Sequence, residues 1–122
     1  MSRKQTMTAV ALIASVLGAG CAKETSFSKD VNPILQKNCL PCHSVWGPGY
    51  AATGLSLESY DSLMKGTKFG AVTKPGFSGA SALVIFVEYD HQPVNMPLGQ
   101  KRLTPEDIKL IKTWIDQGAK NN

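Results

Sequence analysis

The pattern of apolar and polar positions is clearest near the end of the chain, where it predicts an amphipathic helix. Wound at about 100° per residue, five apolar residues share one arc and polar residues fill the opposite side. The members of the arc are Ile108, Leu110, Ile111, Trp114 and Ile115. Thr104 is a suitable N-cap, Pro105 fits the first helical position and Gly118 suits the C-terminal end. We expect this arc to pack against another helix.

A second apolar face predicts a helix over residues 27–38. Its members, spaced as on one side of a helix, are Phe27, Val31, Ile34 and Leu35. Pro33 is tolerated only near a helix start, so the regular helix is expected from Asn32 onward, after a looser turn. This face is the natural partner of the C-terminal arc.

Shorter elements are expected between these two helices. Residues 59–65 predict a helix that stops at Gly66, and the isolated apolar run 81–87 favours a short buried helix over a strand. Glycine and proline predict loops over 44–54, 66–79 and 88–100. Loops of this length are unusual in a small domain, and a large apolar cofactor at its centre would explain how they stay ordered.

The first twenty residues have the pattern of a secretory signal peptide. Arg3 and Lys4 precede an apolar run over 9–17, and small residues follow up to Gly20. The run is shorter than the roughly 20 residues that a membrane-spanning helix needs. We therefore expect residues 1–20 to be a signal peptide and the protein to lie outside the cytoplasm, in the periplasm or cell envelope.

The residues around Cys21 resemble a bacterial lipobox, in which the cysteine becomes the lipidated first residue of a lipoprotein. Lipidation would anchor the protein to a membrane surface and would account for the odd number of cysteines. The match departs at Gly18, where an aliphatic residue is usual, so cleavage after Gly20 or Ala22 by the ordinary signal peptidase stays open. Residues 21–26 are expected to form a tether.

The charge balance gives no indication of a nucleic-acid partner. Without Arg3 and Lys4, 11 basic residues face nine acidic ones, which leaves a formal charge of +2. No basic stripe with interleaved aromatic residues is present in the sequence. We therefore expect no binding to nucleic acid.

Residues 39–43 carry the most specific chemistry in the chain. Cys39, Cys42 and His43 form the sequence C-x-x-C-H, the attachment signature of c-type haem. Two thiols at this spacing can reach adjacent vinyl groups from one turn of backbone and form two thioethers, and the next histidine then lies under the iron as its proximal ligand. The other N–H of His43 needs an acceptor, for which the turns at Pro48 and Pro75 are candidates. We expect one covalent haem c.

Other interpretations of the two cysteines fit the sequence less well. A thioredoxin-like dithiol requires a preceding strand and a βαβ context, and neither is predicted here. A zinc site requires a second pair of ligands, which His91 alone does not provide.

Met96 is the expected second axial ligand of the iron. It lies between Pro93 and Pro97 in the loop before the last helix, and Pro97 is expected to hold it in extended geometry. The alternatives are His91, in a polar context, and Met64, in an apolar helical stretch where methionine usually fills the core. An open site also remains.

The order of these features resembles class I c-type cytochromes, and more narrowly the planctomycete-type cytochrome c domain. The matching stretches are 30–35 (DVNPIL), 39–43 (CLPCH), 54–57 (GLSL), 59–60 (SY), 63–66 (LMKG), 75–76 (PG) with Ser81 and Leu83, 96–97 (MP) and 108–118. The resemblance implies an all-α cytochrome c fold over 27–122, with crossed first and last helices and haem between residues 39–43 and the Met96 loop. It makes Leu57, Tyr60 and Trp114 candidates to pack against haem.

The resemblance also implies single-electron transfer between extracytoplasmic redox proteins, without enzymatic activity. Basic residues flank the segments expected at the haem edge and would steer an acidic redox partner; they are Lys65, Lys68, Lys74, Lys101 and Arg102. A fixed relay subunit of a larger redox complex is the main alternative. A haem-based sensor, which requires an open or displaceable axial position, is another.

Overall fold

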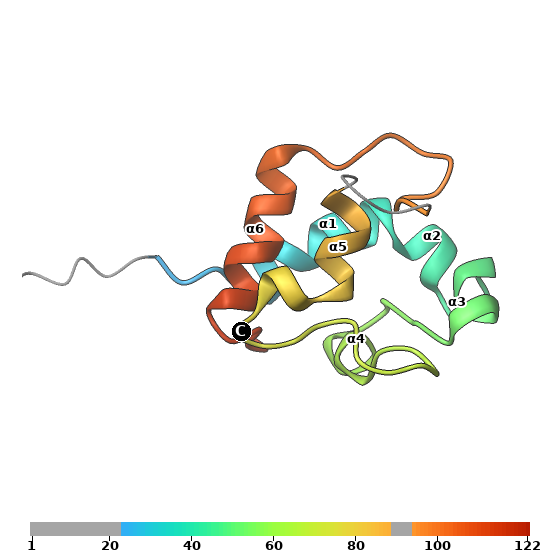
Figure 1. The fold of residues 1–122 in the computed structure, drawn as a ribbon, viewed down its shortest axis with the longest axis horizontal. Helices are drawn as coiled ribbons and strands as arrows, with labels where there is room; N and C mark the ends of the chain where they lie inside the picture. Colours follow the sequence, from blue (N-terminus) through green and yellow to red (C-terminus); the bar gives the residue numbers. More distant parts are fainter. Residues whose placement is uncertain (1–22, 89–93) are drawn as a thin grey trace, which may run out of the picture.

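The computed structural model describes residues 23–88 and 94–122, which form short helices joined by loops (Figure 1). The elements, in chain order, are η1 (Phe27–Val31), α1 (Asn32–Asn38), α2 (Leu40–His43), α3 (Pro48–Thr53), α4 (Tyr60–Lys65), η2 (Ser78–Ala80), α5 (Ala82–Glu88) and α6 (Pro105–Asp116). These residues contain no strand, only an isolated bridge between Thr67 and Gly70. The expected helical class is confirmed for the described chain. Within it, no helix is long and apolar enough to cross a bilayer.

Helix α6 begins and ends as its sequence predicts. The hydroxyl of Thr104 accepts a hydrogen bond from the backbone N–H of Asp107 at 3.1 Å, and Pro105 occupies the first turn. The buried side of the helix is narrower than expected, because only Ile111, Trp114 and Ile115 are fully covered. Its partners η1, η2 and α5 cover that side. Leu110 lies at the edge of the predicted arc, and the expectation that it would be buried with the rest of that arc is wrong, because its side chain is exposed.

The helix predicted over 27–38 is confirmed in two parts. Residues Phe27–Val31 form one wide π-helical turn, and the regular α-helix α1 starts at Asn32, one residue before Pro33. The whole predicted apolar face is buried, and η1 packs against α6 as expected. The wide turn places Phe27 at the start of the core.

Three aromatic rings from distant parts of the chain form the aromatic cluster. Phe27 meets Tyr60 edge to face with ring centroids 5.2 Å apart, and its centroid lies 5.4 Å from that of Trp114. The Tyr60 hydroxyl donates to the carbonyl of Ala119 at 2.7 Å, and the Trp114 indole N–H donates to the carbonyl of Lys120 at 2.9 Å. Both polar atoms are therefore satisfied, while the rings of Phe27 and Trp114 are buried and that of Tyr60 is partly buried.

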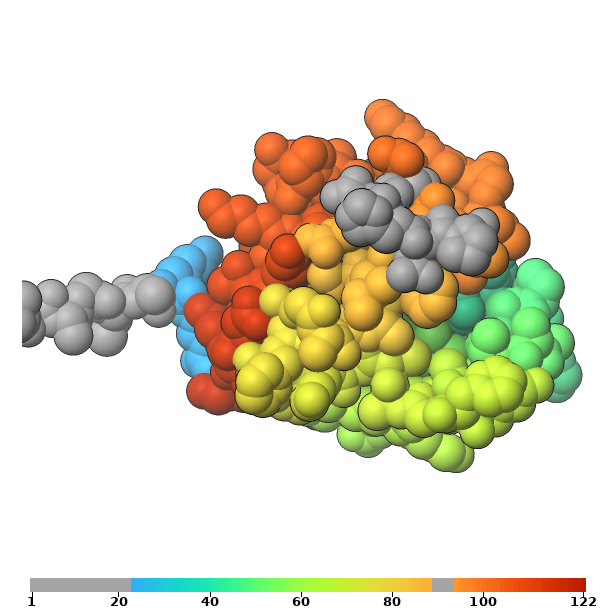
Figure 2. Space-filling model, viewed as in Figure 1, coloured from blue at the N-terminus to red at the C-terminus, as the bar shows by residue number. Residues whose placement is uncertain are grey.

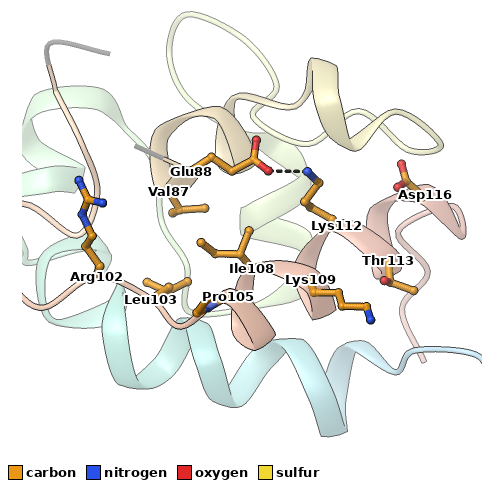
Figure 3. Close-up of a pocket in the computed structure, with 10 residues that line it drawn as sticks. All are labelled: Val87, Glu88, Arg102, Leu103, Pro105, Ile108, Lys109, Lys112, Thr113 and Asp116. Atoms are coloured by element: carbon orange, nitrogen blue, oxygen red, sulfur yellow. Dashed lines mark hydrogen bonds and ion pairs between the residues drawn. The ribbon is translucent and has the colours of Figure 1, made fainter. Parts of the chain in front are cut away.

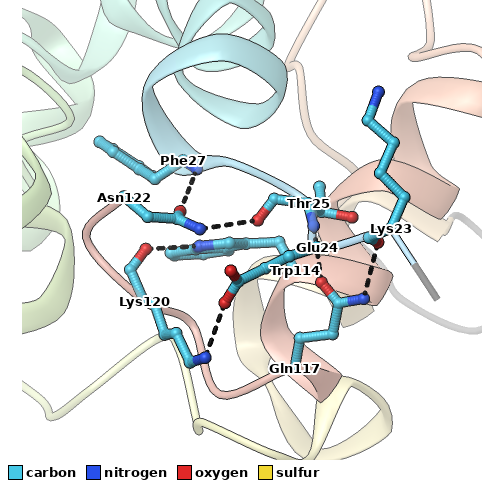
Figure 4. A network of polar contacts seen from close by, with 8 residues as sticks. All are labelled: Lys23, Glu24, Thr25, Phe27, Trp114, Gln117, Lys120 and Asn122. Atoms are coloured by element: carbon cyan, nitrogen blue, oxygen red, sulfur yellow. Dashed lines mark hydrogen bonds and ion pairs between the residues drawn. The ribbon is translucent and has the colours of Figure 1, made fainter. Parts of the chain in front are cut away.

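Residues 23–26, expected in the tether, belong to the folded body (Figure 4). The Thr25 N–H donates to the side-chain oxygen of Gln117 at 2.7 Å, and Thr25 itself is buried. Glu24 pairs with Lys120 at 2.6 Å. Cys21 and the predicted signal peptide lie outside the described residues.

The chain between the two main helices contains two short elements in stretches predicted as loops, α3 and the 3-10 turn η2. Helix α4 is capped by Ser59 and stops at Gly66, and the apolar run predicted over 81–87 forms helix α5 (Ala82–Glu88) rather than a strand. The prediction of a loop over 44–54 was wrong, because Pro48–Thr53 form α3. Its start at a proline and its stop at Gly54, which has a φ of 77°, follow ordinary helix-end chemistry.

Candidate functional site: a cavity beside Cys39, Cys42 and His43

Cys39, Cys42 and His43 lie on one turn of backbone at the α1–α2 junction. The N–H of Cys39 bonds to the carbonyl of Leu35 at 2.9 Å and ends α1, while the N–H of His43 bonds back to the carbonyl of Cys39 at 3.0 Å. Both cysteines are free thiols and partly buried. All three side chains line the same cavity.

This cavity has a volume of about 460 Å³, within the range typical of sites for small molecules and cofactors. Its wall comes from α2, α3, the segment 55–57, α5 and the loop 94–100. No Asp, Glu, Lys or Arg is among the described residues that line it. Leucine, valine and phenylalanine side chains dominate instead, so the cavity suits a large apolar group. We call it the haem-sized cavity.

The ring of His43 is fixed by a backbone carbonyl. Its Nδ1 lies 3.2 Å from the carbonyl oxygen of Leu55, and the residue is 9 % exposed. A carbonyl oxygen only accepts, so Nδ1 must carry the proton, and the lone pair of the neutral ring is then on Nε2. The expectation that the acceptor lies in the turn at Pro48 or Pro75 was wrong, since it lies just after α3.

Two glycines allow the chain after the motif to pass close to it. A Cβ on Gly47 would lie 2.3 Å from the carbonyl oxygen of Cys42, and one on Gly49 would lie 2.7 Å from Cε1 of His43. Such distances leave no room for a side chain. The backbone of 47–49 therefore acts as a wall behind the imidazole.

Met96 lines the haem-sized cavity together with His43. Its N–H donates to the carbonyl of Phe86 at 2.8 Å, which attaches the loop to α5. The Met96–Pro97 peptide bond is cis, which the sequence analysis did not anticipate. Met64 packs against the hydrophobic core and does not line the cavity. His91 lies outside the described residues.

Burial changes the acidity of one thiol. It raises the pKa of Cys39 from 9.0 to about 11, and the neighbouring Cys42 adds to the shift. The free thiol of Cys39 is therefore protonated at neutral pH.

The three residues expected to pack against haem lie in two different places, one at the cavity and two away from it. Leu57 lines the cavity, and its N–H donates to the carbonyl of His43 at 2.8 Å. Tyr60 and Trp114 do not line it, because their rings and polar atoms are used in the aromatic cluster. Lining residues that the sequence analysis missed come mainly from α3 and α5, among them Ala52, Thr53, Leu83 and Phe86.

Lysines at the surface are combined with exposed aromatic rings. The ammonium of Lys68 lies 5.2 Å from the ring centroid of Phe69, and that of Lys74 lies 5.1 Å from the ring centroid of Phe77. Both rings are exposed, Phe69 to 80 %. In Figure 2 the yellow-green segment that carries both pairs runs along one side of the molecule.

A second, more open cavity of about 730 Å³ lies between the end of α5 and α6 (Figure 3). Charged side chains line much of it, including an ion pair between Glu88 and Lys112. The haem-sized cavity differs from it in having no charged side chain among the described residues that line it, and in containing both thiols and the buried imidazole.

No family model, curated protein or solved structure matches this chain. Within residues 23–88 and 94–122, no three His, Cys, Asp or Glu side chains are grouped to hold a metal ion among themselves. The fit of haem to the site therefore depends on the donors and the shape of the cavity. Two free thiols, an imidazole with Nε2 available and a thioether line one space that has no charged side chain among its described lining residues. The thiols and the imidazole are the groups that attach a c-type haem, and the thioether can serve as a second axial ligand.

Proposed function

We propose that this chain is a monohaem c-type cytochrome with a cytochrome c fold, and that it carries single electrons between redox proteins outside the cytoplasm. The observation that carries the proposal is the shared lining of the haem-sized cavity. The motif residues Cys39, Cys42 and His43 and the distant Met96 all reach this one uncharged space.

The chain offers a complete set of attachments for haem. Cys39 and Cys42 would hold it as thioethers, and His43 and Met96 would be its two axial ligands. The group supplies an iron that alternates between two oxidation states, with a potential raised by a His/Met pair relative to two histidines.

The remaining wall determines the surroundings of the iron. Apolar residues of α3 and α5 that line the cavity would keep the surroundings of a bound haem apolar, which would favour the iron state of lower net charge and raise the potential. The hydrogen bond to Leu55 keeps the proton of His43 on Nδ1. If His43 and Met96 both bound the iron, it would have no open site for a substrate, which favours a carrier over an enzyme.

Visible spectra of the Met96→Ala and Met64→Ala variants test this assignment. The unmodified protein should show the reduced-minus-oxidised spectrum of a c-type haem, with the weak long-wavelength band of methionine–iron ligation in the oxidised form. Met96→Ala should lose that band and Met64→Ala should keep it, because Met64 packs in the core. A protein without covalent haem after expression with the haem-attachment machinery would overturn the proposed function.

Carbon monoxide binding distinguishes the carrier from a haem-based sensor. The reduced unmodified protein should bind carbon monoxide poorly, since Met96 occupies the position it needs, and Met96→Ala should bind it readily. Ready binding by the unmodified protein would favour the sensor.

We also propose that Cys21 is lipidated, on the strength of the sequence before it. The intact mass of the natively expressed protein should correspond to a chain that starts at Cys21 and carries haem plus lipid. A chain that starts at Ala22 or later would remove the anchor and leave the electron-transfer proposal unaffected.

A further inference from the structure

We propose that Thr53 is a positioning residue for His43, acting through the two backbone groups that hold the imidazole. The inference rests on the proposed function, because it concerns the ring that would bind iron. Thr53 is the last residue of α3 and itself lines the haem-sized cavity.

The hydroxyl of Thr53 bridges two backbone groups. It donates to the carbonyl of Gly49 at 2.7 Å and accepts from the N–H of Leu55 at 3.2 Å. The same two residues contact His43, since the Leu55 carbonyl accepts from Nδ1 and Gly49 lies against the ring. The hydroxyl oxygen of Thr53 therefore links Leu55, whose carbonyl accepts from the imidazole, to Gly49, which lies against the ring.

The backbone carbonyl of Thr53 also links the end of α3 to the turn at 67–70. It accepts from the N–H of Lys68 at 2.9 Å. Gly54 separates Thr53 from Leu55 with a φ of 77°, so the hydroxyl bonds across a sharp bend at the helix end. Without this hydroxyl, the N–H of Leu55 would lose its bond to the end of α3, and the carbonyl of the same residue would be held less firmly.

The expected effect follows from how a second partner tunes a histidine ligand. A well-placed acceptor at Nδ1 makes the ligating nitrogen more basic and fixes the plane of the ring. A more basic ligand stabilises the oxidised iron. Loosening the Leu55 carbonyl should therefore shift the reduction potential upward.

Thr67 provides a matched control. Its hydroxyl accepts from the N–H of Phe69 at 3.0 Å and donates to the carbonyl of Gly70 at 3.0 Å, and it lines the same cavity. These bonds stay within the 67–70 turn and involve neither Leu55 nor Gly49. Removing this hydroxyl tests for a general effect of a threonine in the cavity wall.

The test compares Thr53→Val, Thr53→Ser and Thr67→Val by potentiometry of the haem-bound protein. Thr53→Val should raise the potential and speed hydrogen exchange of the Leu55 amide, and Thr53→Ser should restore both values. Thr67→Val, which also removes a hydroxyl from the cavity wall, should raise the potential less than Thr53→Val and leave exchange of the Leu55 amide at the parent rate. Equal shifts in Thr53→Val and Thr67→Val, or no shift in either, would overturn the proposal. A failure of haem attachment in the unmodified protein would instead reject the proposed function.

If Thr53→Val does not fold, two glycine variants test whether α3 positions His43. Gly49→Ala puts a methyl group against the imidazole, whereas a Cβ at Gly79 meets no atom within 4 Å. We expect Gly49→Ala to shift the potential and to reduce the fraction of protein with the methionine–iron band, and Gly79→Ala to match the parent. Identical spectra and potentials for the two variants would show that α3 does not position His43.

Discussion

The aromatic cluster and the haem-sized cavity are two solutions to the same packing problem in one small molecule. In the cluster, Phe27, Tyr60 and Trp114 pack ring against ring and Trp114 is 1 % exposed. In the cavity, apolar side chains surround about 460 Å³ that no described side chain fills. Side chains that face such a space lose the contacts of a close-packed interior.

The difference indicates how stability is distributed. The cluster is complete from its own residues and binds the start of the described chain to its end. On the proposed function, haem would pack against the cavity wall and bring it to the same density. Variants and conditions that act on one region and spare the other should therefore separate the two.

The largest expected effect is on the cluster. Trp114→Ala should lower the free energy of unfolding by about 3–5 kcal/mol, because it removes a fully buried ring and leaves a void. Trp46→Ala is the matched control: Trp46 is 93 % exposed, and its loss should stay within about 0.5 kcal/mol. Denaturant unfolding of the haem-bound protein measures both. Similar costs for the two variants would contradict the packing described for Trp114.

A leucine pair distinguishes the two regions directly. Leu35 is buried away from the cavity lining, and Leu35→Ala should cost about 2–5 kcal/mol with or without haem. Leu57 lines the cavity, so Leu57→Ala should cost less in haem-free protein than in haem-bound protein. Denaturant unfolding of both forms gives the four values. An equal cost for Leu57→Ala in both forms would show that nothing packs against this side chain when haem is attached.

A pH effect is expected in the haem-free protein alone. Burial raises the pKa of Cys39 to about 11 in the fold, against 9.0 for an unperturbed thiol. The folded state then keeps a proton that the unfolded chain loses, so the free energy of unfolding should fall as pH rises from 9.0 to about 11. Urea unfolding across this window measures the fall.

Two controls accompany the pH series. Cys39→Ser has no thiol to titrate and should lack this part of the fall. The haem-bound protein, in which Cys39 is expected to be a thioether, should lack it too. A fall of equal size in all three proteins would assign it to other groups.

The smallest expected effect on the free energy of unfolding comes from the ion pair between α5 and α6. Lys112 pairs with Glu88, and both side chains are more than a third exposed, so breaking the pair should cost less than about 1 kcal/mol. A double-mutant cycle with Lys112→Ala and Glu88→Ala measures the coupling, which should shrink as salt is added. A coupling that salt does not change would indicate a drier contact than these exposures imply.

Elements with an apolar face of their own could be predicted from the sequence. Helix α6 and the helix over 27–38 have such faces, and proline or a capping threonine marks where they begin. Helix α3 has no buried residue at all, because its inner side faces the cavity. Because α3 buries no apolar side chain, its residues carry no periodic pattern, and only Pro48 and Gly54 indicated its ends.

The site was predictable where side chains carry the chemistry. The motif identifies Cys39, Cys42 and His43, and its spacing alone places them on one turn. The acceptor for His43 is a backbone carbonyl, which every residue has, so the sequence gives no reason to choose Leu55. The positions of Tyr60 and Trp114 were not predictable for a related reason. An aromatic ring can pack equally well against a cofactor or against another ring, and only the fold shows that these two pack against each other.

The hydrogen bonds and the ion pair between residues 23–26 and the chain after α6 also determine where a group attached before residue 23 would lie on the molecule. In Figure 1 the described chain starts beside α6, at the opposite end of the long axis from α2 and α3. The Phe27 N–H donates to the side chain of Asn122 at 2.8 Å, so the start of η1 is held against the last residue of the chain. Anything attached ahead of Lys23 would therefore join the molecule beside α6, at the end away from α2 and α3, which contribute to the cavity wall.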